Sequence, residues 1–577
     1  MGALPEFDFS HYFTYAEMVD FLQAAVAAYP HLITLESLGN SRQGRQIWLA
    51  TLTDQNTGPA LDKPAYWIDA NTHAGEVTGS AVALYTIHHL LSQYGADPQA
   101  TQLLDGHTLY VLPRLAVDGA EQYLTTPEDL RSSPHAYPDP DKKDGLHRQD
   151  INGDGLILQM RLRDNCGAWK VSDRDPRLMV RREPDEFGGT YYTLLPEGLI
   201  HNFDGYDVRV APPLAGMDFN RNYPFEWAPE GEQKGAGAYP FSEPETRAEA
   251  EFWRSHRNIN GFVTYHTFSA VLLRPYSTHP DQHFPVEDLE TFQLIGEKGT
   301  QRTGYECVSV YHKFRYHPKQ ILHGGMDDYA YDHWGWFGFT TELWDLPTAA
   351  GIQKGDYIQW YRRHSEADDL KILQWNDKHL DGEGFVDWQP FEHPQLGPVE
   401  IGGWKEKVTW DNAPPQVLPQ LCRQHCQFTL AHALMSPKLA IAKAGVQPQG
   451  SYLYKVILQL ENQGFLPTYT SQKALERQIV QPIAVEVQMP ETATLVMGQA
   501  KQRVGHLEGR ANKVYLKAFT DTGAVDFRRK LEWVIQAPAG TRLQIVAQAE
   551  RAGTVRTELL LGEPLISTTE ETGIPGL

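Results

Sequence analysis

The 577-residue sequence lacks features that mark several specialised classes of protein. It has 4 cysteines, too few for a disulfide framework, so we expect reduced thiols. No apolar run reaches the roughly 18 residues of a membrane span, and we expect no membrane partner. Lys and Arg total 51 against 73 acidic residues, a net charge of −22. Because binding a phosphate backbone needs a basic surface, we expect no nucleic-acid partner.

The first residues, MGALPEFDFSHYF, contain neither the basic segment nor the apolar segment of a signal peptide. As the sequence stands we expect a cytoplasmic protein, and a secreted one if a leader has been removed. The GxSxG nucleophile elbow, the HExxH zinc motif, the Walker loop and the Rossmann fingerprint are also absent. These absences argue against the enzyme classes that such motifs mark.

Strand-like and helix-like segments alternate over the first 350 or so residues. AYWIDA at 65–70 is a nearly unbroken apolar run, typical of a strand buried on both faces, and GFVTYHT at 261–267 is another predicted strand. This alternation predicts an α/β domain with a mixed sheet flanked by helices. Within it, residues 125–215 are rich in Pro, Gly, Asp and Arg and predict an insertion of loops, and residues 365–436 predict a helical extension with helices at 366–378 and 415–435.

The character of the chain changes after Pro437. Short alternating segments such as YLYKVILQL, KLEWVIQAP and RLQIVAQAE follow one another with turn residues between them. That pattern is typical of a small β-sandwich. We therefore predict an α/β domain over residues 1–436 and an all-β sandwich domain over residues 437–577.

One pair of polar residues and two single polar residues stand at the ends of predicted strands. His73 and Glu76 stand where a strand gives way to a helix, the usual place for a ligand in an open α/β sheet. Imidazole and carboxylate are zinc ligands, but a catalytic zinc takes three protein ligands. His266 and Glu342 each stand at the end of another apolar strand. Alone, a strand-terminal His such as His266 is more often a hydrogen-bonded core residue, whereas a carboxylate in an apolar strand is costly unless it is paired or functional.

Eight separated segments between Tyr12 and residue 365 resemble the zinc metallocarboxypeptidases of the carboxypeptidase A type, the M14 family. The segments are GNSRQGRQIWLATL, THAGEVTG, LPRLAVDGAEQYL, GMDFNRNYPFEW, YPFSEPETRAEAEFW, GFVTYHTFS, GGMDDYAYDHWG and GFTTELW. The resemblance implies a carboxypeptidase-like fold and a role for each of six residues. They are His73, Glu76 and His266 as zinc ligands, Glu342 as the catalytic glutamate, and Asn220 with Arg221 as the pair that holds the substrate's terminal carboxylate.

The resemblance also implies an arginine that stabilises the oxyanion, and here the match is ambiguous. Arg161 in LQMRLRD is the best match and Arg163 the alternative. The family's mobile tyrosine falls on Gln320, with Tyr316 the nearest candidate for that substrate contact. The arginine often found between the first two zinc ligands is Gly75 here.

Asp327, in GGMDDYAY, falls where family members that remove Lys or Arg carry an acidic pocket residue. The resemblance therefore implies a lean toward basic C-terminal residues, with the next residue, Asp328, as the family's structural aspartate. The alternative is that Asp327 caps the helix that it precedes, as Asp often does.

Asp150, Asn152 and Asp154 repeat the front of a calcium loop, with Gly155 at its sixth position. The twelfth position, where a bidentate Glu belongs, is Arg161, so a complete EF-hand is excluded. The two readings that stay open are a partial Ca²⁺ loop that borrows a distant carboxylate and an Asn-Gly/Asp-Gly turn.

The function that we expect is that of a zinc exopeptidase acting on peptides with a free C-terminal carboxylate. One alternative in the same superfamily is an amidase or deacylase acting on acylamino acids or cell-wall peptides. Another, from a different class, is an inactive peptide-binding module. The oligomeric state stays open.

Overall fold

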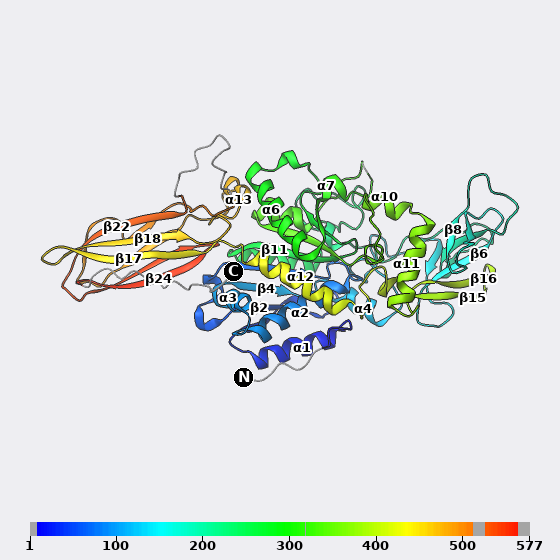
Figure 1. The fold of residues 1–577 in the computed structure, drawn as a ribbon, viewed down its shortest axis with the longest axis horizontal. Helices are drawn as coiled ribbons and strands as arrows, with labels where there is room; N and C mark the ends of the chain where they lie inside the picture. Colours follow the sequence, from blue (N-terminus) through cyan, green and yellow to red (C-terminus); the bar gives the residue numbers. More distant parts are fainter. Residues whose placement is uncertain (1–7, 318, 512–525, 563–577) are drawn as a thin grey trace.

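The computed structural model describes residues 8–317, 319–511 and 526–562 (Figure 1). Its centre is an eight-stranded sheet with the order β1-β2-β4-β3-β11-β14-β12-β13. These strands are β1 (Ile33–Asn40), β2 (Gln46–Leu52), β3 (Ala65–Ala70), β4 (Thr108–Leu112), β11 (Ile259–Thr267), β12 (Val271–Arg274), β13 (Glu306–Ser309) and β14 (Phe337–Leu343). The four pairs β3–β4, β3–β11, β11–β14 and β12–β13 are parallel and the other three antiparallel, so the predicted mixed sheet is confirmed.

Side chains of β3 alternate between the two faces of this sheet. Tyr66 and Ile68 pack in a core with α1 (Tyr15–Ala28), α2 (Val77–Gln93) and α12 (Leu418–Ala433). Trp67 packs on the other face with α5 (Pro244–Ser255) and α8 (Met326–Trp334). Helices on both faces explain why every residue of β3 is buried.

Further helices surround this core. They are α3 (Pro98–Gly106), α4 (Val117–Thr125), α6 (Val286–Thr303), α7 (Val310–Lys313), α9 (Leu346–Ala349), α10 (Tyr357–Arg362) and α11 (Glu366–His379). The helices expected at 366–378 and 415–435 correspond to α11 and α12. In the part of the chain that the structure describes, no helix combines the length and the apolar character needed to cross a membrane.

The segment expected to be loops contains strands instead. They are β5 (Gly145–Arg148), β6 (Gln159–Arg163), β7 (Trp169–Val171), β8 (Met179–Arg181), β9 (Tyr192–Pro196) and β10 (Gly198–His201). Four of them join β15 (Phe385–His393) and β16 (Gly397–Trp404), from the expected helical extension, in a sheet of order β15-β16-β6-β9-β7-β8. Strands of three to five residues are too short to show alternation, and β6 pairs with a strand more than 200 residues away.

The C-terminal domain is a sandwich of two antiparallel sheets, as predicted. One sheet has the order β17-β18-β22-β20 and the other β21-β19-β23-β24. Their bounds are β17 (Leu439–Gly450), β18 (Leu453–Asn462), β19 (Ala484–Gln488), β20 (Thr494–Met497), β21 (Lys501–Arg503), β22 (Arg528–Gln536), β23 (Arg542–Ala549) and β24 (Gly553–Leu560), with one short helix, α13 (Gln472–Glu476), between β18 and β19. Val456 and Trp533 of the first sheet share a core with Val485 and Ile545 of the second. Figure 1 shows this domain at the opposite end of the molecule from the β6 sheet.

Candidate active site

The residues expected to bind zinc lie at the carboxyl ends of neighbouring parallel strands. His73 and Glu76 lie in the turn between β3 and α2, and His266 lies near the end of β11, the strand next to β3. Glu342 lies on β14 directly opposite His266 in the strand register. Because β3, β11 and β14 are parallel, their carboxyl ends meet at one edge of the sheet, where ligands bind in open α/β folds.

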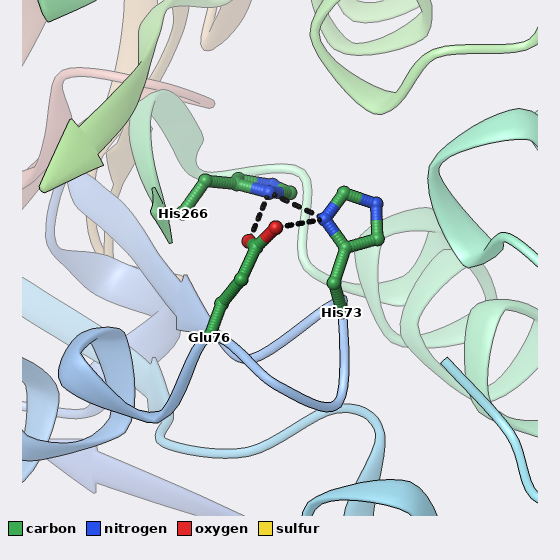
Figure 2. A group of neighbouring side chains, drawn as sticks. All are labelled: His73, Glu76 and His266. Atoms are coloured by element: carbon green, nitrogen blue, oxygen red, sulfur yellow. Dashed lines mark hydrogen bonds and ion pairs between the residues drawn. The ribbon is translucent and has the colours of Figure 1, made fainter. Parts of the chain in front are cut away.

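The three side chains point toward one another (Figure 2). Nδ1 of His73 lies 2.7 Å from Oε1 of Glu76, and Nδ1 of His266 lies 2.8 Å from Oε2 of Glu76. The two Nδ1 atoms are 3.1 Å apart. Within the described ranges, this is the one group of three or more His, Cys, Asp or Glu whose ligand atoms lie within 4.8 Å of one another. Two imidazoles and a carboxylate converging from three sides are a donor set that Zn²⁺ accepts.

Electrostatics show how strongly these groups interact. Burial alone would raise the pKa of Glu76, but His73 and His266 outweigh it and lower that pKa far below its usual range. Burial lowers the pKa of His266, and the carboxylate of Glu76 outweighs that effect and raises it to about 9. Without a metal, therefore, Glu76 stays ionised and His266 takes a proton. A divalent cation at the same point would replace that proton, because a ligating imidazole is neutral.

Glu342 faces this group without forming an ion pair of its own within the described residues. Burial and the charge of Glu76 raise the pKa of Glu342 to about 8, against the opposing influence of His266, Arg131 and Arg221. A carboxylate that ionises near neutral pH is suited to accept and return a proton.

Asp218 and Arg131 complete the site, and neither was anticipated from the sequence. Asp218 lies between β10 and α5, and its Oδ1 lies 3.1 Å from Nε2 of His73. Its Oδ2 accepts from Nε of Arg131 at 2.9 Å, while Nη1 of Arg131 lies 3.6 Å from Oε1 of Glu76. An acceptor on the second nitrogen of a ligating histidine fixes the ring orientation. Asp218 stands two residues before Asn220, so the sequence motif around Asn220 could have pointed to it. Arg131 lies in an irregular segment whose sequence shows no periodic pattern.

The structure does not bring Arg161, the residue expected to stabilise the oxyanion, to this site. Arg161 lies on β6, where Nε and Nη2 donate to the two oxygens of Glu400 at 2.8 and 3.1 Å. Its guanidinium also lies over the rings of Tyr192 and Trp388. The alternative, Arg163, lies on the same strand. The expectation was wrong because short motif similarity inside an insertion does not indicate which sheet the strand joins.

Asn220 and Arg221 lie in a single 3-10 turn, Phe219–Arg221, and the side chain of Asp218 caps the turn by accepting from the N–H of Asn220 at 2.9 Å. Arg221 is 7% exposed and donates from Nη1 to the carbonyl oxygen of Asn220 at 2.6 Å. Over the residues that the structure describes, no carboxylate oxygen lies within 4.0 Å of its guanidinium nitrogens. Asp218, Asp327 and Glu342 interact with its charge only at longer range, so the N–H groups of this buried guanidinium are open to an anion from outside.

Asp327 and Asp328 follow Met326 in the first turn of α8, beside this turn. Asp328 accepts from the backbone N–H of Ser277 at 2.8 Å and from the hydroxyl of Thr278 at 3.1 Å, so it serves the backbone. Asp327 is 5% exposed and accepts from the N–H of Asp328 at 3.0 Å. Burial raises the pKa of Asp327, while the charges of Arg221 and His266 lower it. Asp327 thus lies in the field of Arg221 and His266.

Tyr316 follows α7 and is an exposed residue. Burial of its hydroxyl raises the pKa of Tyr316, and the charges of Arg131 and Arg221 oppose that shift. Because Arg131 and Arg221 both act on this pKa, the phenol lies near the same edge of the sheet as these two arginines. Its carbonyl oxygen accepts from Nη2 of Arg362 on α10.

The loop predicted to bind calcium, which begins at Asp150, is held together by hydrogen bonds from its own backbone N–H groups. Asp150 accepts from the N–H groups of Gly153 and Gly155 at 2.7 and 2.9 Å, and Asp154 accepts from Leu156 at 2.8 Å. Asn152 accepts from the N–H of Asp154 at 2.9 Å. These bonds are those of the alternative turn, and Ca²⁺ binding stays a prediction.

Comparison with known proteins gives two family matches. Residues 18–362 match the model of the zinc carboxypeptidase family, and residues 438–559 match a model described as a domain of unknown function. Carboxypeptidase A2 of Rattus norvegicus is 24% identical over 352 residues, covering 59% of this chain and 64% of that protein. Carboxypeptidase A6 of Homo sapiens is 23% identical over 356 residues, covering 59% of this chain and 62% of that protein. The chain thus spans less than two thirds of the length of these relatives.

Solved structures with similarity include carboxypeptidases. The crystal structure of thrombin-activatable fibrinolysis inhibitor has a TM-score of 0.43 and 17% identity, covering 74% of this chain and 75% of that one. Carboxypeptidase A from Helicoverpa armigera has a TM-score of 0.40 and 17% identity, covering 65% and 75%. The family model itself covers more than half of the 577 residues. The chain therefore belongs to the zinc carboxypeptidase family, M14.

Proposed function

We propose that this chain is a zinc-dependent exopeptidase that hydrolyses the C-terminal peptide bond of peptides. The observation that carries the proposal is Arg221, a buried guanidinium that, among the described residues, has no carboxylate within 4.0 Å. It lies in the same site as the His73, Glu76 and His266 group, since both Arg221 and Glu76 act on Glu342. A free substrate carboxylate would supply the missing anion, because the arginine fork binds a carboxylate through two hydrogen bonds. Asn220 stands beside Arg221 and would share that carboxylate.

The metal would be held by His73, Glu76 and His266. When bound there, Zn²⁺ lowers the pKa of a water molecule toward ~7 and polarises a carbonyl group. Glu342 accepts the proton of the attacking water and later returns it to the leaving amine. Burial raises the pKa of Glu342 and a bound cation would lower it again, and a carboxylate balanced in this way near neutral pH both accepts and releases a proton readily.

Arg131, rather than Arg161, is the residue that we assign to the oxyanion. Its side chain is 39% exposed, so part of the guanidinium is free to meet a substrate while Asp218 holds Nε. Negative charge develops on the carbonyl oxygen in the transition state, and a positioned cation stabilises it. Tyr316 would contact the substrate from the exposed side of the site.

Asp327 supports the proposed preference for substrates with a basic C-terminal residue. It is buried beside the Asn220–Arg221 turn and, in the described part of the chain, its only hydrogen bond is to the next backbone N–H. The ammonium or guanidinium group of a C-terminal Lys or Arg would pair with this carboxylate in a desolvated pocket.

The test uses a set of acetylated tripeptides that end in Lys, Met, Phe or Glu, together with their C-terminal amides. The wild type is expected to release the last amino acid from the free acids and not from the amides. Glu342→Gln, with the same zinc content, is expected to lower kcat by about 10²- to 10⁴-fold. Glu290→Gln, an exposed residue of α6, is the matched control. Equal release by wild type and Glu342→Gln would refute the proposed mechanism.

The same assay tests the basic preference. Lys and Met side chains have similar length, so the ratio of their kcat/KM values reports the charge. Asp327→Asn is expected to lower that ratio about tenfold or more, the effect of losing a charged hydrogen bond of ~1.5–3 kcal/mol. Hydrolysis of acylamino acids in preference to every tripeptide would instead favour an amidase or deacylase.

Several expectations stay predictions beside this proposal. They are Ca²⁺ binding by Asp150, Asn152 and Asp154, the cytoplasmic location, and the absence of nucleic-acid and membrane partners.

A further inference from the structure

The sandwich domain holds the C-terminal end of α8. Oγ of Ser471 donates to the carbonyl oxygen of Gly335 at 2.7 Å, and Nη2 of Arg551 donates to the carbonyl oxygen of Trp334 at 2.6 Å. Ser471 and Arg551 are 1% and 2% exposed. The last carbonyl groups of a helix have no partner inside the helix, so they must be satisfied from elsewhere. For α8 that partner is a different domain.

Asp332, in the last turn of α8, forms the charged part of the same contact. Its side chain is 4% exposed and pairs with Arg477 and, at 3.7 Å, with Nζ of Lys473. The hydroxyl of Tyr276 donates to the same carboxylate at 3.0 Å. Cationic groups at a helix C-terminus also offset the helix dipole. The sandwich domain supplies the cations, and α8 supplies the buried anion.

The two domains approach closely at this point. Gly335 ends α8 with a φ of 65°, and a Cβ added there would lie 2.6 Å from Cβ of Ala474 and from Oγ of Ser471. Asp288 of α6 accepts from the N–H of Gln472 at 2.8 Å and from the hydroxyl of Tyr331 on α8 at 2.8 Å. α6, α8 and α13 are therefore joined through buried hydrogen bonds.

The other end of α8 contacts the residues proposed to bind the substrate. The N–H of Met326, the first residue of α8, donates to Oδ1 of Asn220 at 2.8 Å. Asp327 is the next residue, and Asp328 ties the same turn to Ser277. α8 has nine residues and is about 14 Å long, which is short enough to move as one rigid body.

We propose that the sandwich domain is a positioning element for the substrate pocket. Lys473, Arg477 and Arg551 hold one end of α8 and thereby fix Asn220 and Asp327 at the other end. This inference rests on the proposed exopeptidase function, because it takes Asn220 and Asp327 as substrate contacts. It assigns a role in catalysis to the region that matches a domain of unknown function.

The chain offers a matched control for this proposal. On β24 of the sandwich domain, Arg556 pairs with Asp62 at 2.7 Å and Thr554 donates to Asp62 at 3.0 Å. This second contact joins the same two domains and touches no residue of α8. The side chains of Arg556 and Arg477 are 49% and 51% exposed, so glutamine at either position opens no cavity.

The experiment measures KM, kcat and Tm for Arg477→Gln, Arg477→Lys and Arg556→Gln in the full chain, with tripeptides ending in Lys and in Met. Arg477→Gln is expected to raise KM for the Lys peptide about three- to tenfold and to lower the Lys-to-Met preference, with kcat nearly unchanged. Arg477→Lys is expected to restore both values. Arg556→Gln is expected to leave KM and the preference unchanged, even where it lowers Tm.

A double variant tests the route through α8. Since Arg477 and Asp332 act through one contact, Arg477→Gln with Asp332→Asn is expected to change KM no more than the larger of the two single changes. Equal KM values for wild type and Arg477→Gln, or the same shift in Arg556→Gln, would overturn the positioning role. Absence of hydrolysis by the wild type would instead count against the proposed function, so the two failures are distinct.

Discussion

Arg131 and Arg161 differ in how much of the guanidinium their partners leave free. Arg161 uses Nε and Nη2 on Glu400, and only 10% of its side chain is exposed. Arg131 uses Nε on Asp218, and 39% of its side chain is exposed at the edge of the metal group. A mostly buried guanidinium that holds a carboxylate through two hydrogen bonds has fewer N–H groups left for charge that develops on a substrate than a more exposed one held through a single hydrogen bond.

This difference predicts opposite effects of the same substitution. Arg131→Gln is expected to lower kcat by about 10²- to 10³-fold, the usual effect of removing one oxyanion donor, with a smaller change in KM. Arg161→Gln is expected to keep kcat and to lower Tm, because Glu400 loses its partner and the rings of Tyr192 and Trp388 lose a cation. Steady-state kinetics and thermal unfolding of both variants check this, and a kcat loss in Arg161→Gln alone would reverse the assignment.

Single residues were predictable where the chain places them at the end of an apolar strand. His73, His266 and Glu342 all stand at such ends, and in the structure they meet at one edge of the sheet. Arg131 gave no comparable signal, because it lies in a turn and reaches the site only through Asp218. Its role depends on a contact between residues 87 positions apart, which no local pattern records.

Helix α12 carries buried histidines that have no role in the proposed hydrolysis. His425 is 1% exposed, and its ring lies 4.7 Å from that of Tyr305. Among the residues that the structure describes, neither of its ring nitrogens has a hydrogen-bond partner. Burial lowers the pKa of His425 to about 3 from an ordinary value near 6.5. Between these two values the unfolded chain binds a proton that the folded chain does not, so acid favours unfolding.

Stability should therefore fall as the pH drops from about 6.5 toward 3. Replacing His425 with Phe removes the titrating group, and the variant is expected to lose less stability than the wild type between pH 7 and pH 5, by up to ~2 kcal/mol. His379→Gln, at an exposed position of α11, serves as the control. Unfolding monitored at both pH values gives the comparison. Identical pH dependence in wild type and His425→Phe would show that this ring is not the group responsible.

Element prediction succeeded where an element is long and buried on a defined face. β3 and β11, fully buried, and α2, with 17 residues, gave strong patterns. β7 and β8 have three residues each and no buried position, so their sequences carry no alternation to recognise. The sheet that they join exists because β6 pairs with β16, a long-range contact that composition cannot indicate.

At the scale of the whole molecule, the metal group joins parts of the chain that are far apart in sequence. His73 and Glu76 precede α2, and His266 lies 190 residues beyond Glu76 on β11. The unfolded chain does not hold these ligands together, so a metal that binds the folded state alone stabilises it. In the absence of a cation, Glu76 and His266 stabilise each other's charged forms, because His266 lowers the pKa of Glu76 and Glu76 raises that of His266.

Removal of zinc with a chelator is therefore expected to lower Tm, and added Zn²⁺ to restore it. With free zinc at 100 times the Kd, binding contributes about 2.7 kcal/mol, which corresponds to a shift of a few degrees in a domain of this size. His266→Ala removes a ligand and should make Tm insensitive to zinc, while His379→Gln should respond as the wild type does. Scanning fluorimetry with parallel determination of bound zinc measures both quantities. A zinc-dependent Tm that persists unchanged in His266→Ala would place the metal elsewhere, because His73, Glu76 and His266 are the one such group of ligands found among the described residues.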